Sequence, residues 1–81
     1  MAIKYKGDTA VLKDVVSVEE AEGLLEWIHN TPKVRIDMSK LIHIHTACLQ
    51  VLMASKIKIL SWPEDELLKM LLEQVLKRQG G

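Results

Sequence analysis

Residues 3–13 largely alternate between apolar and polar side chains, which is the period of a β-strand with one buried face. Ile3 and Tyr5 are the apolar members of the first run, and a second run of the same period follows Gly7-Asp8. Glycine at the first position of a two-residue turn favours a type II′ hairpin, because that position needs a positive φ. The pattern therefore predicts two antiparallel strands joined at Gly7-Asp8.

The spacing of apolar residues changes to a helical period after Ser17. Ser17 followed three residues later by Glu20 predicts a capping box, in which each side chain accepts a hydrogen bond from the backbone N–H of the other residue. Proline disfavours helical backbone in the residue before it, so the predicted helix ends at Asn30-Thr31-Pro32. The apolar face expected for this helix consists of Val18, Ala21, Leu24, Leu25 and Ile28.

The remaining chain predicts a strand, a helix, a strand and a last helix. Residues 33–39 and 56–62 have period two, whereas residues 46–55 are apolar on nearly every side and predict a short, deeply buried helix. Pro63 suits the first position of the last helix, where its missing N–H costs no hydrogen bond. The apolar stripe expected for that helix consists of Leu67, Leu68, Leu71, Leu72, Val75 and Leu76.

The order ββαβαβα predicts an α/β fold, a two-layer sandwich with a mixed four-stranded sheet and the helices mainly on one face. Right-handed crossovers between neighbouring parallel strands place the linking helices on the same side. Fully covered parallel strands are apolar throughout, whereas these strands carry charges on one face, so we expect the other sheet face to stay open. That face is either solvated or a docking surface for a partner or a second copy, with Leu60 and Trp62 on it. The single domain expected spans residues 1–79, and residues 80–81 are an expected disordered tail.

Composition narrows the functional classes. The chain of 81 residues has 11 basic and 11 acidic side chains, so no net field attracts nucleic acid or an anionic membrane. A single cysteine, Cys48, cannot form an internal disulfide, which agrees with a reducing cytosol. No apolar stretch approaches the roughly 18 residues of a membrane span, and the first residues do not have the pattern of a signal peptide. We therefore expect a cytoplasmic protein without membrane insertion.

The family resemblance of this chain lies in residues 34–54, which read VRIDMSKLIHIHTACLQVLMA. This stretch resembles the signature of the STAS domain, the family of anti-sigma-factor antagonists, sulfate-transporter C-terminal domains and related bacterial regulators. Family members carry a strand that ends in Asp-Leu-Ser, a short loop, and Asp-Ser/Thr-Ala-Gly-Leu at the start of an apolar helix. Asp37-Met38-Ser39 stands at the first motif here, and residues 45–49 stand at the second. The resemblance implies a STAS-like fold and a regulatory role.

In that family a partner kinase phosphorylates the Ser or Thr at the helix start, which switches partner binding off, and the matching residue here is Thr46. A helix N-terminus offers unpaired N–H groups and the positive end of the dipole, both of which suit a phosphate. The simpler interpretation makes Thr46 only the N-cap of the helix. His45 stands where the family has an acid, and Cys48 stands where it has glycine.

The resemblance also implies the partner class and the contact surface. We expect the loop 39–45 and the start of the next helix to dock against an anti-sigma factor or a serine/threonine kinase of the switch type. A structural subunit bound to the ATPase of a membrane ABC transporter is the alternative within the interaction class. The contact residues expected are Ser39, Lys40, His43, His45 and Thr46.

Metal binding and catalysis have weaker signals in the same stretch. His43, His45 and Cys48 could supply three soft ligands to zinc or copper, which makes a small metal-binding protein a further alternative, although structural zinc usually has four ligands. Thr46, His45 and Asp37 could act as nucleophile, base and orienting group, but no Gly-rich oxyanion or phosphate loop accompanies them. We expect no catalytic activity and no cofactor.

Nucleic-acid binding would depend on the open sheet face. The first three strands offer no aromatic side chain on that face for base stacking, because Tyr5 belongs to the apolar set. A solvated face accounts for the cations there equally well, so we expect no nucleic-acid partner. These cations are Lys4, Lys6, Arg35 and Lys58.

Overall fold

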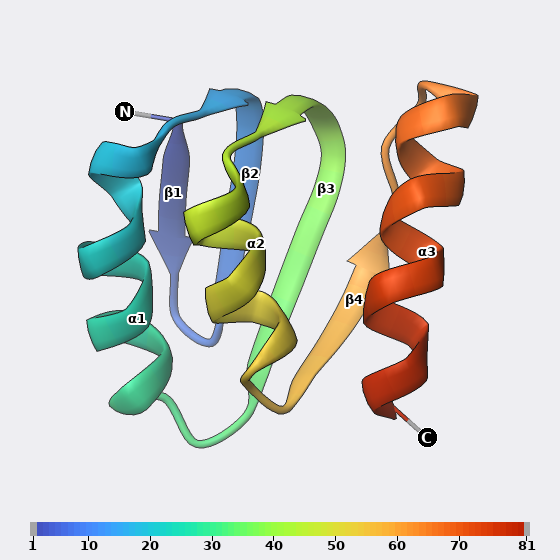
Figure 1. Cartoon of the computed structure of the whole chain (residues 1–81). Helices are drawn as coiled ribbons and strands as arrows, with labels where there is room; N and C mark the ends of the chain where they lie inside the picture. The colour runs from blue at the N-terminus through green and yellow to red at the C-terminus, as the bar shows by residue number, and fades with distance from the viewer. Residues whose placement is uncertain (1, 81) are drawn as a thin grey trace.

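The computed structural model describes residues 2–80, with side chains through residue 76. The elements follow the predicted order ββαβαβα, with a short 3-10 helix added before the first α-helix (Figure 1). They are β1 (Ile3–Lys6), β2 (Thr9–Val16), η1 (Val18–Glu20), α1 (Ala21–His29), β3 (Val34–Ile44), α2 (Thr46–Met53), β4 (Ile57–Ser61) and α3 (Glu66–Gly80).

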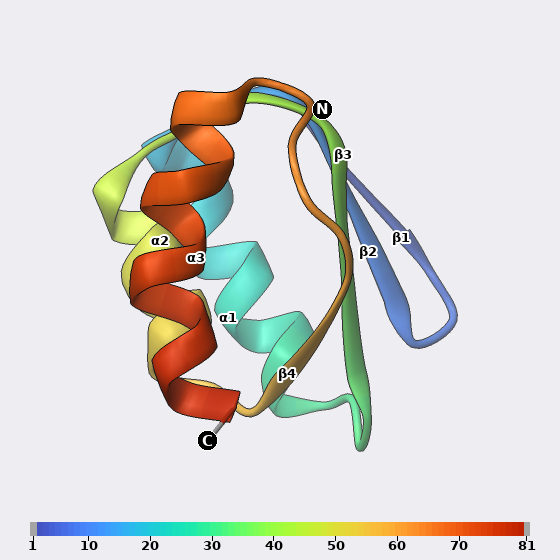
Figure 2. The same cartoon turned by 90° about the vertical axis from the view of Figure 1, so that its right-hand side faces the viewer.

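The four strands form one mixed sheet in the order β1-β2-β3-β4. β1 is antiparallel to β2, and β2, β3 and β4 run parallel. All three α-helices lie on the same side of the sheet, and its other face is bare of helices among the described residues (Figure 2). The predicted two-layer α/β sandwich with an open sheet face is therefore confirmed, and the shared hand of the two crossovers explains why α1 and α2 lie on the same side.

The hairpin at the start of the chain has the predicted turn. Lys6 pairs with Thr9, so the turn consists of Gly7 and Asp8, and Gly7 has a φ of 59°. Among the described non-glycine residues a positive φ occurs only at Asp14, so φ at Asp8 is negative. A positive φ at the first turn position alone is the mark of a type II′ turn.

A single aliphatic core fills the space between the sheet and the helices. Leu24 of α1 is buried in it, as predicted, but Val18 and Leu25 of the expected apolar face are exposed. Trp27 packs against the core instead, with its ring centroid 5.0 Å from that of Tyr5. The fully buried large side chains of the core are Leu12, Val16, Leu24, Ile36, Met38, Cys48 and Leu52.

The predicted capping box at Ser17 is wrong. Neither Ser17 nor Glu20 makes a side-chain cap hydrogen bond, because the chain forms a 3-10 turn in which the Glu20 N–H donates to the Ser17 carbonyl at 3.1 Å. That i to i+3 bond uses the N–H which the serine hydroxyl was expected to satisfy. The Glu20 Oε2 atom is left buried without a hydrogen-bond partner among the described residues.

The end of α1 follows the prediction. The helix stops at His29, and the Asn30 side chain donates from Nδ2 to the Glu26 carbonyl at 3.0 Å. The Thr31 hydroxyl donates to the Trp27 carbonyl at 2.6 Å. Two side chains thus satisfy carbonyls that the helix end leaves without intrahelical partners.

Two expectations about β4 and α3 are corrected by the structure. Trp62 packs against the core and does not lie on the open face, because Leu60 is an extra residue where β4 pairs with β3 and shifts the alternation by one position. Leu60 itself is exposed, as expected. Pro63 precedes α3, whose N-cap is Asp65, since the Asp65 carboxylate accepts from the Leu68 N–H at 3.0 Å.

The body of the protein covers only part of the α3 apolar stripe. Leu72 and Leu76 are buried, but Leu67 is 61% exposed, and Leu71 is exposed as well. The helix α2 was expected to be deeply buried. It contributes Cys48 and Leu52 to the core, but it is not buried on every side. The expected tail at residues 80–81 begins at the last residue of α3, and residue 81 lies outside the described residues.

Candidate functional site

β3 is longer than predicted, and this changes the nature of the candidate site. The strand continues to Ile44, so the expected loop 39–45 is wrong over residues 39–44, which are extended and paired with β2. The reason is tertiary: β2 runs on to Val16, and its second half supplies backbone partners for the second half of β3.

Two irregularities interrupt the pairing of β3 with β2. Between the pairs Val11–Asp37 and Lys13–Lys40, and again between Asp14–Leu41 and Val15–His43, β3 contains one residue more than β2. Each is a β-bulge, which shifts the side-chain alternation and increases the local twist. The shift allows Leu41 and Ile44, three positions apart, both to face the core.

Asp14 lies opposite the second irregularity and has a φ of 56°. This left-handed conformation is uncommon outside glycine, and such residues cluster at functional sites. β4 no longer accompanies β3 here, since the last pair between these strands is Asp37–Ser61. At the point where β4 leaves, the Asp37 carboxylate accepts a hydrogen bond from the Ser39 N–H at 2.9 Å.

Ser39 and Lys40 line a hollow of about 590 Å³ beside this bulged part of the sheet. Lys13, Asp14 and the residues Glu64 and Asp65 before α3 complete its charged lining. Ile42, the most exposed large apolar side chain at 66%, stands at the same hollow. The hollow therefore combines two cations, three carboxylates and an exposed aliphatic group.

The junction between β3 and α2 is organised by His45. Its backbone N–H donates to the Val16 carbonyl at 2.8 Å, and its ring Nδ1 accepts from the Ala47 N–H at 3.0 Å. The His45 carbonyl accepts from the N–H groups of Cys48 and Leu49, both at 3.0 Å. His45 is therefore the N-cap of α2, and the simpler interpretation of Thr46 as the N-cap is wrong. Thr46 is the first residue of the helix and is exposed.

Cys48 connects α2 to the chain segment before α1. Its side chain is fully buried, and the thiol donates to the Ser17 carbonyl at 3.2 Å. Burial, and secondarily the neighbouring Glu20 carboxylate, raise the pKa of the Cys48 thiol. The residue is a neutral core side chain that also holds two elements together.

The structure separates the residues that were considered as metal ligands. Cys48 points into the core, whereas His43 and His45 are exposed. Among the described residues no group of three or more His, Cys, Asp or Glu side chains could hold a metal ion. The considered catalytic trio is not assembled either, because Asp37 and His45 accept from the backbone amides of Ser39 and Ala47.

The five expected contact residues fall into two groups. Ser39 and Lys40 belong to the hollow at the bulged strand, whereas His45 and Thr46 belong to the start of α2. His43 lies between them on β3, exposed and paired with Val15, which is also exposed. The sequence predicted a loop over residues 39–45 with Thr46 at the helix start. The structure keeps Thr46 there but places Ser39, Lys40 and His43 on strand β3.

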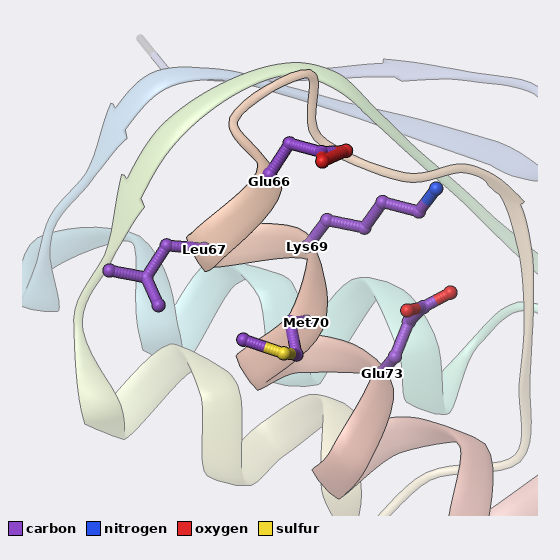
Figure 3. Close-up of a pocket in the computed structure, with 5 residues that line it drawn as sticks. All are labelled: Glu66, Leu67, Lys69, Met70 and Glu73. Carbon is purple, nitrogen blue, oxygen red and sulfur yellow. The ribbon is translucent and has the colours of Figure 1, made fainter.

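A second hollow, of about 430 Å³, lies on the outer side of α3 and was not expected from the sequence. In Figure 3, Leu67 and Met70 point to one side of the helix, and Lys69 and Glu73 point to the other. Glu66 completes the lining. The signal in the sequence was the width of the apolar stripe, which exceeds what one neighbouring layer can cover.

Comparisons with protein-family models, with curated proteins and with solved structures found no match to this chain. No helix in the described part of the chain is both long and apolar enough to span a membrane.

Proposed function

We propose that this protein is a cytoplasmic regulatory interaction module that resembles the anti-sigma-factor antagonists. Its partner is an anti-sigma factor or serine/threonine kinase of the switch type. The partner docks on this protein at the second half of β3 and the start of α2. Thr46 is the residue whose phosphorylation would control docking. The resemblance of residues 34–54 to the STAS signature is the source of the partner class.

The observation that carries the proposal is the exposure of Thr46 at the first position of α2. A kinase can reach this hydroxyl without unfolding the helix, because Thr46 does not serve as the N-cap. A phosphate added there would lie at the positive end of the helix dipole and would change the surface charge by about −1.5 to −2.

The test uses the purified chain with serine/threonine kinases of the switch type from the same genome. ATP should add one phosphate to the wild type and to Thr46→Ser, and none to Thr46→Ala, as measured by intact mass. Gln50→Ala is the matched control, since Gln50 is exposed on the same helix one turn on. Phosphate on Thr46→Ala, or on no variant, would contradict the switch.

Binding is tested separately from modification. Lys40→Glu and His43→Ala should each weaken binding of the unphosphorylated chain to the partner by about tenfold, if each loses one charged or polar contact. Lys6→Glu on the distant hairpin should bind like the wild type. If the partner binds but Thr46 is not phosphorylated, the result favours the structural role considered for a transporter subunit. If Lys6→Glu loses as much partner affinity as Lys40→Glu and His43→Ala, docking at β3 and α2 is refuted.

A further inference from the structure

The chain has no net charge, but its charges are separated in space. Eight basic side chains but only three acidic ones (Asp8, Asp14 and Asp37) belong to the sheet or to the loops that enter it, whereas the exposed acids of α1 and of the approach to α3 lie in the helical layer. The eight cations are Lys4, Lys6, Lys13, Lys33, Arg35, Lys40, Lys56 and Lys58. A composition of 11 against 11 therefore conceals a local positive surface.

Four of these cations surround one hollow of about 450 Å³ at the start of β3 and β4. Arg35 and Lys58 are direct partners across the two strands, so their side chains leave the sheet on the same face. Lys33 and Lys56 directly precede the paired residues Val34 and Ile57 and line the same hollow. No acidic residue is among its lining residues, the rest of which are apolar or proline.

The four cations have no ion-pair partner among the residues that the structure describes. Like charges directly opposite on neighbouring strands, which lie about 4.8 Å apart, destabilise a sheet. Lys6 adds a further cation to the same row of the sheet, through the pairs Lys6–Thr9 and Thr9–Arg35. A cluster of like charges that destabilises the sheet and has no internal ion pair is stabilised by an external anion with several negative charges.

We propose that this hollow, lined by Lys33, Arg35, Lys56 and Lys58, binds a ligand that carries two or more adjacent phosphate groups. Arginine binds phosphate oxygens in a bidentate manner, and lysines act as point charges around them. Several adjacent phosphates match a cluster of four cations better than one monovalent anion does. The hollow has no aromatic lining residue for base stacking, which disfavours single-stranded nucleic acid.

This site is distinct from the docking surface proposed above. β3 begins at the cationic hollow and ends at the start of α2, so the two sites lie at opposite ends of one strand (Figure 1). Arg35 is held in place there by its backbone, whose N–H donates to the Asp8 carbonyl at 2.9 Å. The ligand is a free oligophosphate or a phosphorylated lipid headgroup, which share the same chemistry.

The test is calorimetric titration of the full chain with tripolyphosphate in about 0.1 M salt, where distant surface charges are screened. We expect saturable binding to the wild type and a loss of at least about tenfold in affinity for Arg35→Gln/Lys58→Gln. Lys4→Gln/Lys13→Gln removes the same charge from the sheet outside the hollow and should change affinity less than about twofold. Equal loss in the two double variants, or no saturable binding to the wild type, would overturn the proposal.

A melting curve separates a lost site from a lost fold. Arg35→Gln/Lys58→Gln should melt at or above the wild-type temperature, because it removes a repulsive pair. A large decrease would assign these residues a structural role and overturn the proposal. Vesicles that contain phosphatidylinositol bisphosphate identify the source: association displaced by tripolyphosphate assigns a lipid headgroup, and no association assigns a free oligophosphate. Binding to single-stranded RNA without a response to tripolyphosphate would also overturn it.

Discussion

The two halves of β3 differ in how many neighbours hold them. Residues 34–37 lie between β2 and β4, and their side chains alternate regularly between the core and the open face. Residues 38–44 pair with β2 alone, contain both bulges of that pairing, and lead into the exposed start of α2. A strand held from both sides keeps a regular alternation with one fully buried face, whereas a strand held from one side tolerates bulges and leaves an edge that can contact a partner.

The largest expected difference concerns one isoleucine in each half. Ile36→Ala should lower the free energy of unfolding by about 2–5 kcal/mol, because Ile36 is fully buried and its removal leaves a cavity. Ile42→Ala makes the same chemical change in the same strand and should alter the free energy by less than about 0.5 kcal/mol, since Ile42 is exposed. Denaturant unfolding measures both, and similar losses would remove the distinction between the halves.

The left-handed backbone at Asp14 gives the next largest effect. Asp14→Val should lower the free energy of unfolding by about 1–2 kcal/mol, because a β-branched side chain clashes in this conformation. Lys13→Val is the matched control on the neighbouring exposed residue, where φ is negative, and should cost little. If the two variants unfold at the same denaturant concentration, the irregular half of the sheet is not strained at Asp14.

The cap at His45 tests how the irregular half ends. His45→Ala should cost about 1 kcal/mol of stability, whereas His45→Asn keeps an acceptor at the N-cap and should cost less. His43→Ala is the control for a nearby exposed histidine. Equal losses in His45→Ala and His43→Ala would show that the ring does not cap the helix.

The smallest effect concerns Cys48 at alkaline pH. The raised pKa keeps the folded thiol protonated where the unfolded thiol, which titrates near pH 8.5, already ionises. Its contribution to stability is therefore complete below about pH 8.5 and is lost as the pH rises toward the folded pKa. The free energy of unfolding should fall more steeply with pH in the wild type than in Cys48→Ala. Equal slopes above pH 8.5 would mean that the thiol does not contribute.

Prediction from the sequence succeeded where no other hydrogen bond or tertiary contact competed with the local rule. Gly7 at the first turn position, Pro32 after α1 and the alternation of Ile3 and Tyr5 led to elements that the structure contains. It failed at Ser17, where a backbone carbonyl took the N–H that the capping rule assigned to a side chain. It also failed at Trp62, because the bulge at Leu60 shifted the period.

The sequence predicted which residues belong to the candidate site better than it predicted how these residues are arranged. The resemblance directed attention to Thr46 and its neighbours, and the structure leaves that residue exposed at a helix start. The cationic hollow could not be found in the same way. Arg35 and Lys58 are separated by 22 intervening residues in the sequence (positions 36 to 57), and only the parallel pairing of β3 with β4 makes them neighbours.

By itself, the sequence determined the order of the elements and the apolar face of the first strands, since these depend on periodicity and turn chemistry within a few residues. Tertiary structure alone decided where β3 ends, because strand length depends on the backbone partners that β2 supplies. It also decided which leucines of α3 remain exposed and which cations meet at one hollow. Burial and charge density are properties of neighbours distant in sequence, and local patterns do not contain them.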